Sequence, residues 1–380
     1  MSTLVTPSDV LKRAHAVGNY YGFSPLSSLT AAKKGQGSRS PYPDNFPLDS
    51  LDTNAKEVAG LLKQVRDASI IPSKEQPLFV WHSNIAPGRP APKHIVVQFH
   101  IIGVDHAIAD AVLIRAVRSF VTDISKKAPE LHLNSMGDKE TRGRFIRELN
   151  TYFKKNGAHL PEECVTHAKS NVFEATEMLL AHKDHFSLPS STDHLSEASR
   201  KHFESILEYL EATDTPYELA PTILSKGNAW IETCFNMQAD DHIQTWGSRY
   251  GELSKPFFKG SLSSVGAVVH ITLDDRGAIA PLKNRAAPRF VFVHIGEEAK
   301  RESMKMADLL RHARIPLTQA IAIESLTAQM RYVDEINPQY LLIMGRKEAL
   351  ERSVILRERA SHTETFIPLD SLIERLRAVA

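Results

Sequence analysis

Only two of the 380 residues are cysteines, Cys164 and Cys234. They form no disulfide framework and no metal-ligand spacing, so we expect free thiols and a protein of the reducing cytoplasm. Long hydrophobic runs are missing as well. The longest falls far short of a bilayer span, which predicts no membrane association. The opening residues, MSTLVTPSDV, lack a basic region followed by an apolar stretch, and we therefore expect no export signal.

An excess of charge of either sign is also absent. The 46 basic and 45 acidic side chains give a net charge of +1. Such a balance offers no global attraction to nucleic acid or to a membrane surface, although local patches remain open. The hydrophobic content of 42% and the charged content of 24% are ordinary for a globular protein. The length suffices for two domains with cores of their own.

Common catalytic and nucleotide-binding motifs are missing too. The chain has no GxGxxG, no P-loop spacing and no Ser-His-Asp or Cys-His signature. Seventeen histidines raise the question of a metal, and His182 and His185 are three apart on one helix face. No further ligand stands at a recognisable spacing, so we interpret both as surface residues. We expect structural roles for His94, His100 and His106, the first two sharing a strand face because their spacing is even.

Hydrophobic periodicity predicts a mixed α/β (α+β) protein with a large first domain and a smaller tail. Residues 274–288, rich in Gly and Pro and without periodicity, lie between them. We therefore place a core at 1–280, a linker at 281–288 and a second domain at 289–380. Strands alternate with helices in the tail, which predicts a mostly parallel sheet there. The predicted strands are 77–82, 94–104, 130–134, 217–224, 230–237, 263–273, 289–296, 319–323, 339–345, 353–358 and 363–369. The clearest predicted helices are 6–23, 107–124, 134–157, 297–315, 325–336 and 370–379.

Several motifs follow one another in order along the chain. The first is LHLNSMGDKETRGRFIRELNTYF, a strand leading into a helix. It is followed by SNVFEA and by SRKHFESILEYLEATDTPYELAPTI, and in the tail by VHIGEEAKRESMKMADLLRHARI and ESLTAQMRYVDEINPQYLLIMGRKE. With these motifs the chain resembles the histidyl-tRNA synthetases, and the two tail motifs resemble the anticodon-binding domain of that family. The likeness runs through residues 6–380. It implies a class II synthetase core, an antiparallel sheet that holds ATP and the amino acid, followed by an α/β anticodon-binding domain.

The charged groups of this family's active site do not fall on matching residues. Anchored on Ile101, Ile102 and Gly103, the resemblance places the arginine that clamps the α-phosphate at His82 and the glutamate that follows it at Asn84. The glutamate that faces the substrate falls on His100. Fixed positive charge is the main electrostatic device of phosphoryl chemistry, and removing one preorganised charge costs two to three orders of magnitude in rate.

Two further segments depart in the same way. In ILSKGNAWIETCFN the arginine specific to the family falls on Ser225, with Lys226 beside it, and lysine lacks the forked contact of arginine. In GAVVHITLD the third arginine falls on Leu273. The segment LDSLDT is the nearest match to a further motif, and Asp49 would reverse the charge of its arginine. We therefore interpret His82, Asn84, His100, Ser225 and Leu273 as degenerate catalytic positions. No catalytic residue and no metal site is predicted.

The tail keeps more of the family pattern. In that family this domain reads the anticodon through contacts to unstacked bases. Residues at matching or adjacent positions are Gln329, Arg331, Arg346, Lys347 and Glu348, which we take as candidate RNA contacts. Residues 289–380 hold 14 basic and 13 acidic side chains, so RNA affinity there cannot rest on net charge.

Three functional hypotheses follow. The first is a non-catalytic paralogue that binds tRNA or regulates a protein partner, for which we expect no cofactor. The family includes a regulatory subunit of histidine biosynthesis, but that relative typically lacks the tail. The second is a genuine histidine–tRNA ligase with divergent motifs, which would use ATP and Mg²⁺. The third is a protein-interaction scaffold without RNA. The resemblance also implies a homodimer.

Overall fold

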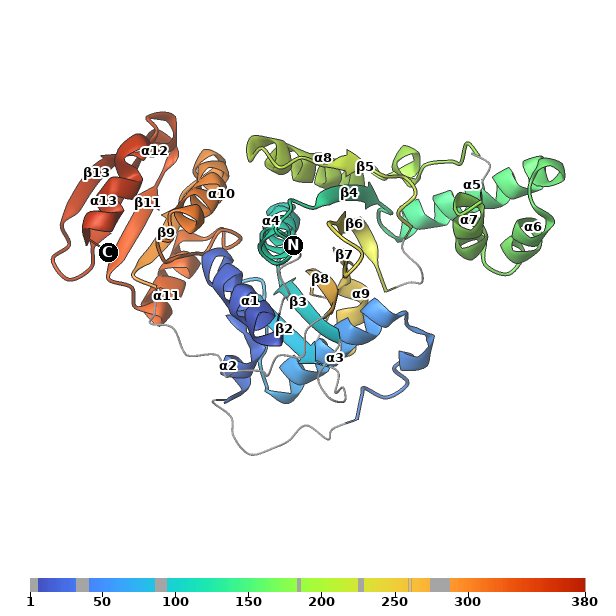
Figure 1. Cartoon of the computed structure of the whole chain (residues 1–380), viewed down its shortest axis with the longest axis horizontal. Coiled ribbons are helices and arrows are strands. Elements are labelled where there is room, and N and C mark those ends of the chain that lie inside the picture. Colours follow the sequence, from blue (N-terminus) through green and yellow to red (C-terminus); the bar gives the residue numbers. More distant parts are fainter. Residues whose placement is uncertain are drawn as a thin grey trace.

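The computed structural model describes residues 6–31, 41–85, 94–182, 186–224, 229–258, 260, 262–273 and 288–379. The molecule is elongated, with a central sheet domain, a helical arm on one side and the C-terminal domain on the other (Figure 1). Within the described ranges, no helix is long and apolar enough to cross a bilayer. The cysteines Cys164 and Cys234 are buried and free, as predicted.

The large sheet has eight strands in the order β1-β2-β3-β8-β7-β6-β4-β5. Pairing is antiparallel from β2 to β4, and only the short edge strands β1 and β5 pair in parallel. This confirms the antiparallel core implied by the resemblance. The strands are β1 (Ser24–Pro25), β2 (Leu78–Ile85), β3 (His94–Ile102), β4 (Glu130–Ser135), β5 (Glu218–Leu219), β6 (Ile231–Gln238), β7 (Ile243–Arg249) and β8 (Ser264–Thr272). The helices of this part are α1 (Pro7–Tyr21), α2 (Leu26–Ala31), α3 (Thr53–Asp67), α4 (Ile108–Ser125), α5 (Lys139–Asn156), α6 (Glu162–Ala168), α7 (Val172–Leu180), α8 (Glu197–Ala212) and α9 (Gly251–Ser254).

Local sequence accounts for the ends of the main helices. Thr6 caps α1 by accepting a hydrogen bond from the Asp9 backbone N–H, and Pro7 fills the first turn. Asp52 caps α3 through the Ala55 N–H. Each cap satisfies a backbone donor that has no partner inside its helix.

The large sheet has two differently covered faces. Alternate residues of β3, such as Val97 and Phe99, are buried in one hydrophobic cluster with Phe120 of α4, and we call this the α4-side face. On the opposite face, Val96 of β3 lies in a second cluster with Leu62 of α3. We call this the α3-side face. The α5–α7 arm has a third cluster of its own.

The C-terminal domain holds a five-stranded sheet in the order β10-β9-β11-β12-β13. Its strands are β9 (Phe290–His294), β10 (Leu317–Gln319), β11 (Tyr340–Met344), β12 (Ser353–Glu358) and β13 (Glu364–Pro368), and its helices are α10 (Glu297–His312), α11 (Leu326–Ile336), α12 (Arg346–Leu350) and α13 (Leu372–Val379). The β9 strand pairs in parallel with β10 and β11, whereas β12 pairs antiparallel with β11 and β13. The prediction of a mostly parallel sheet is therefore only half right, because β11, β12 and β13 follow one another without a long crossover helix.

Other predictions of secondary structure also need correction. The strand predicted at 217–224 shrinks to β5, and the one predicted at 319–323 lies earlier, at Leu317–Gln319. The helix α3 and the strand β7 were not predicted. The predicted linker at 281–288 lies, apart from Pro288, outside the described residues.

Buried polar contacts join the two domains. The hydroxyl of Tyr21 in α1 contacts both Ser119 of α4 and the Asp308 carboxylate of α10, and Asp308 also pairs with Arg115 of α4. Nearby, Arg311 of α10 donates to both oxygens of an α4 carboxylate, at 3.1 and 3.0 Å. These contacts fix the C-terminal domain against α1 and α4.

Candidate functional site

Three of the predicted degenerate positions lie on the α3-side face. His82 and Asn84 are two residues apart on β2, and His100 lies on the adjacent strand β3, where it pairs with Val80. A period of two in each strand puts all three side chains on one face. The structure thus brings together what sequence reasoning placed in one site. Ser225 lies outside the described residues.

Leu273 does not belong to this group. It follows β8 and packs into the hydrophobic cluster that contains α4, on the other side of the sheet. The structure therefore does not bring Leu273 together with the other degenerate positions. His270, three residues earlier in β8, does reach the α3-side face, where it contacts Asn54 of α3. Adjacent residues of a strand point to opposite faces, so a slip of one residue in the alignment changes the face on which a position falls.

His100 is fully buried, and both of its ring nitrogens have a hydrogen-bond partner. Its Nδ1 lies 2.8 Å from the Tyr250 hydroxyl and its Nε2 lies 3.1 Å from Oε1 of Gln98. The amide of Gln98 donates in turn to Oε2 of Glu57 at 3.2 Å. Because an amide oxygen only accepts, Nε2 carries the proton, and Nδ1 accepts from the Tyr250 hydroxyl. The chain Tyr250–His100–Gln98–Glu57 therefore runs in one direction with a neutral imidazole.

Burial, together with a smaller contribution from the nearby His82, lowers the pKa of His100 to about 3. The ring lies directly on the backbone of Gly266, where an added Cβ would stand 2.1 Å from Nδ1. This position therefore requires glycine for close approach. His100 cannot replace a substrate-facing carboxylate, because its environment keeps it uncharged.

Two other histidines of the α3-side face have lowered pKa values. Burial lowers the pKa of His82, whose Nε2 lies 3.3 Å from the amide nitrogen of Gln64 in α3. Burial and the neighbouring His94 lower the pKa of His270. The rings of His94 and His270 stack at 5.4 Å, with a nitrogen–nitrogen distance of 3.2 Å. As expected from their even spacing, His94 and His100 share a strand face.

The central strands supply no free cation to this face. The residues of β2, β3, β4, β6 and β8 include no lysine or arginine. The strand β7 carries Arg249, which is 3% exposed and pairs with the buried Asp110 of α4. Arg249 also donates to the backbone carbonyl oxygens of Val104 and His106. Its guanidinium is thus committed to fixing α4 on the sheet.

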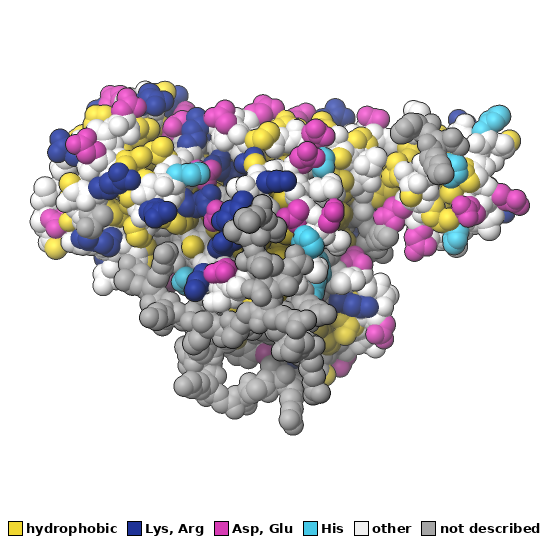
Figure 2. Space-filling model, in the orientation of Figure 1, with side chains coloured by type: hydrophobic (Ala, Val, Ile, Leu, Met, Phe, Trp, Pro, Cys, Tyr) yellow, Lys and Arg dark blue, Asp and Glu magenta, His cyan; other side chains and the backbone are white. Residues whose placement is uncertain are grey.

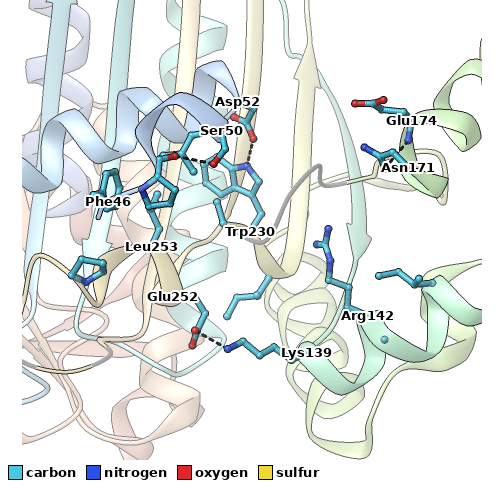
Figure 3. Close-up of a pocket in the computed structure, with 17 residues that line it drawn as sticks. Phe46, Ser50, Asp52, Lys139, Arg142, Asn171, Glu174, Trp230, Glu252 and Leu253 are labelled. Atoms are coloured by element: carbon cyan, nitrogen blue, oxygen red, sulfur yellow. Dashed lines mark hydrogen bonds and ion pairs between the residues drawn. The ribbon is translucent and has the colours of Figure 1, made fainter. Parts of the chain in front are cut away.

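A cavity of about 920 Å³ remains beside this face. Figure 3 shows Ser50, Asp52 and Trp230 on one side of it and Asn171 and Glu174 of the helical arm on the other. Residues 50–52 and 229–231 meet at this cavity, and both belong to segments that the resemblance aligns with substrate-binding motifs.

The Trp230 side chain closes the cavity toward His100. The indole is 2% exposed, packs edge-on against Tyr250, and donates from Nε1 to Oδ2 of Asp52 at 2.7 Å. At the mouth, Lys139 and Glu252 form an ion pair at 2.8 Å. The described residues of the cavity lining carry two cations, Lys139 and Arg142, against three carboxylates. Such a lining does not favour a triphosphate.

Among the described residues, no group of three or more His, Cys, Asp or Glu side chains is placed to hold a metal ion. His182 has the Phe186 ring as a neighbour, and its predicted companion His185 lies outside the described residues. His106 sits near Asp105 and Glu324, at 3.4 and 3.5 Å, between the two domains.

The candidate RNA contacts in the C-terminal domain differ in their surroundings. Gln329 is fully buried, and its amide bonds both the N–H and the carbonyl of His294. This gives Gln329 a structural role, because it clamps α11 to β9, and corrects its prediction as an RNA contact. Glu348 accepts from the Gly345 N–H and so caps α12. Arg331, Arg346 and Lys347 are exposed, with Arg346 3.3 Å from Glu298.

Comparison with known proteins agrees with the architecture. Residues 278–379 match the anticodon binding domain family. The histidine–tRNA ligase of Geobacillus sp. (strain WCH70) is 26% identical over 297 residues, covering 74% of this chain and 70% of that protein. The enzyme of Symbiobacterium thermophilum is 24% identical over 307 residues, covering 78% and 71%.

Solved structures of the same kind are similar too. Apo histidyl-tRNA synthetase of S. aureus has 16% identity and a TM-score of 0.48, covering 99% of this chain and 98% of that one. An ATP phosphoribosyltransferase regulatory subunit/histidyl-tRNA synthetase from Bacillus halodurans C has 13% identity and a TM-score of 0.43, covering 89% and 93%. By sequence, the chain is therefore similar to histidine–tRNA ligases over about three quarters of its length, and its C-terminal domain matches the anticodon binding domain family.

Proposed function

We propose that this protein is a catalytically inactive member of the histidyl-tRNA synthetase-like family that binds tRNA. The observation that carries this proposal is that the α3-side face has uncharged, hydrogen-bonded side chains at the aligned positions. The side chains at the aligned positions His82 and His100 are neutral and hydrogen-bonded within the fold. Adenylate formation builds negative charge on the α-phosphate, and a pocket needs preorganised cations to stabilise it.

The binding half of the proposal rests on the C-terminal domain. Its match to the anticodon binding domain family supports an RNA partner. The exposed cations Arg331, Arg346 and Lys347 supply donors for bases and phosphates. Because Gln329 is used inside the fold, contacts from α11 would come from the exposed residues of its outer face.

Two measurements test the two halves separately. In ATP–pyrophosphate exchange with histidine, we expect no signal above background, whereas a genuine ligase with divergent motifs would incorporate label into ATP. In a gel shift with total tRNA at about 100 mM salt, we expect a shifted complex that weakens as salt rises. A chain that shows neither exchange nor a shift would be the protein-interaction scaffold instead.

A matched pair of variants locates the RNA contact. Arg346→Gln with Lys347→Gln removes two exposed cations of α12, whereas Lys154→Gln with Lys155→Gln removes two from the end of α5. We expect only the first pair to weaken tRNA binding, by about tenfold. Equal binding by both pairs would contradict the assignment to the C-terminal domain. A homodimer stays a prediction, which sedimentation equilibrium would test.

A further inference from the structure

A second large cleft, of about 880 Å³, lies where the C-terminal domain meets α1 and the end of α4. We call it the interdomain cleft. Its walls are the middle of α1, the last turn of α4, the residues before β9, and the segment from the end of α10 to the start of β10. The space-filling view shows Lys and Arg side chains gathered where the C-terminal domain meets this side of the core (Figure 2).

The lining of the interdomain cleft is strongly cationic. Its described lining residues include five cations and a single carboxylate, Asp123; the cations are Arg13, Lys126, Arg289, Arg311 and Arg314. The cavity beside the α3-side face has two cations and three carboxylates. A third cleft between the domains has Lys74 and Arg331 against Glu75, Asp105 and Glu324. An overall charge of +1 therefore conceals a local excess at the interdomain cleft.

Helix dipoles explain part of this excess. The cleft contains the C-terminal ends of α4 and α10, each carrying about half a negative charge, and cations there stabilise the helices. These two ends and Asp123 together offset about two of the five positive charges, which leaves a surplus of about +3. Arg13 lies in the middle of α1 and Arg289 lies before β9, so neither serves a helix end.

The donors of the cleft are not all used by the fold. Nη1 of Arg13 is buried and has no hydrogen-bond partner among the described residues. Arg314 is exposed, and within the same ranges its side chain contacts no carboxylate. By contrast, Arg311 is held by Asp123, and Arg289 donates to Oε1 of Gln339. The hydrogen-bonded guanidinium groups of Arg311 and Arg289 keep a fixed geometry, whereas those of Arg13 and Arg314 can donate to a ligand.

The cleft is preformed by the buried contacts that join the domains. Asp308 of α10 contacts Tyr21 of α1 and Arg115 of α4, and Gln319 of β10 donates to the carbonyl of Tyr20 in α1 at 3.3 Å. At the end of α1, Gly22 has a φ of 81°, and a Cβ there would meet the Gln319 carbonyl at 2.6 Å. Glycine is therefore required for this approach. A rigid cleft loses little entropy when it binds.

We propose that the interdomain cleft binds a nucleotide unit, with the cationic rim on its phosphates and the apolar floor on its base. The floor includes Tyr20, Pro316 and Leu317, and bases stack on aromatic and apolar side chains. The volume is that of a small-molecule site. This chemistry has two sources, a single strand of RNA or a free nucleotide. The RNA source rests on the proposed function, and the free nucleotide does not.

The test uses the full chain and two probes, a fluorescein-labelled single-stranded RNA of about 12 nucleotides and a fluorescent ATP derivative, each followed by anisotropy. The cleft pair is Arg13→Gln with Arg314→Asn. Arg314 has a φ of 60°, a conformation that asparagine tolerates well. The control pair, Lys12→Gln with Lys127→Gln, removes two exposed cations next in sequence to cleft residues but outside its lining.

We expect the cleft pair to weaken binding of at least one probe by about tenfold, and the control pair to change it by less than about twofold. For RNA, the slope of log affinity against log salt should fall by about 1.4, from about 0.7 for each of two lost phosphate contacts. Loss with RNA alone assigns the site to RNA, and loss with ATP alone assigns it to a free nucleotide.

Equal affinities of the cleft and control pairs for both probes would overturn the proposal, as would a wild-type chain that binds neither. Failure of the proposed function looks different. In that case the wild type binds ATP in the interdomain cleft but no RNA. If instead RNA binds tightly and the cleft pair matches the control pair with both probes, tRNA binding stands and the nucleotide site in the cleft does not.

Discussion

The α3-side face and the interdomain cleft place their polar groups in opposite ways. On the α3-side face, His82, His100 and Gln98 have partners inside the fold. In the interdomain cleft, Arg13 and Arg314 retain unpaired donors. Polar groups that are satisfied internally stabilise a fold, whereas unpaired cations at a preformed cavity are available to a ligand. In this protein, therefore, the polar groups of the α3-side face stabilise the fold, and the unpaired cations lie in the interdomain cleft.

The largest expected effect comes from returning a charge to the α3-side face. His100→Glu places a carboxylate in a fully buried position, near the carboxylate of Glu57. An unpaired buried charge costs about 3–5 kcal/mol, so we expect a loss of that order in the free energy of unfolding. Urea denaturation at neutral pH measures it.

The control for this change is His100→Gln, which keeps a neutral polar side chain, and it should cost about 1–2 kcal/mol. If His100→Glu were as stable as the wild type and gained ATP–pyrophosphate exchange, the α3-side face would be an active site after all.

The second prediction concerns the loss of stability at acidic pH that His100 causes. The pKa of His100 falls from about 6.5 in the unfolded chain to about 3 in the fold. Below pH 6.5 the unfolded chain binds a proton at His100 that the folded chain does not bind. The contribution of His100 to the free energy of unfolding is therefore fully present above that pH and falls as pH drops toward 3. The slope is about 1.4 kcal/mol per pH unit.

Between pH 6.5 and 4.5, His100 should therefore cost about 2–3 kcal/mol. Its neighbours are His82, whose pKa is also lowered, the Tyr250 hydroxyl and, through Gln98, Glu57. His100→Gln should flatten the profile by that amount in urea titrations. A profile identical to wild type would show that His100 is charged in the fold.

A smaller effect tests the hydrogen-bond chain. Tyr250→Phe removes the hydroxyl that donates to Nδ1 of His100 and leaves that nitrogen buried without a partner. We expect a loss of about 1–3 kcal/mol in the free energy of unfolding, measured by urea denaturation. Tyr42→Phe is the control, because Tyr42 packs against the same hydrophobic cluster at its edge. A loss as small as that of the control would show that the chain contributes little.

More of the fold than of the site could be predicted from the sequence. The antiparallel core, α1 with its cap at Thr6, and the burial of Phe120 in α4 were predictable, because caps and strong periodicity are local signals. The helix α3 was equally readable, since Val58, Leu61, Leu62 and Val65 have helical spacing. The strand β7 was not, because Gly247 and the polar residues of IQTWGSR hide its alternation.

The hydrogen-bond partners of the site residues could not be predicted from the sequence. His82 and His100 share a face because of the register in which β2 pairs with β3, which spacing within one strand does not give. The contacts of His100 with Tyr250 and of Trp230 with Asp52 join residues 150 and 178 positions apart. Gln98, a polar residue between apolar neighbours in β3, was the one local signal of a buried network. The interdomain cleft gave no signal at all, because its cations come from four separate segments.

The smallest expected effect is the change in stability when two cations of the interdomain cleft are replaced. Lys126 and Arg314 have positive φ values of 62° and 60° after α4 and α10. Asparagine suits this conformation better than lysine or arginine does. Lys126→Asn with Arg314→Asn loses charge–dipole interactions of about 0.3–1 kcal/mol each and gains a similar amount in backbone conformation. We therefore expect the free energy of unfolding to change by less than about 1 kcal/mol, measured by urea denaturation. A loss above about 2 kcal/mol would mean that these cations hold the fold together as the α3-side face does, and the contrast between the two regions would disappear.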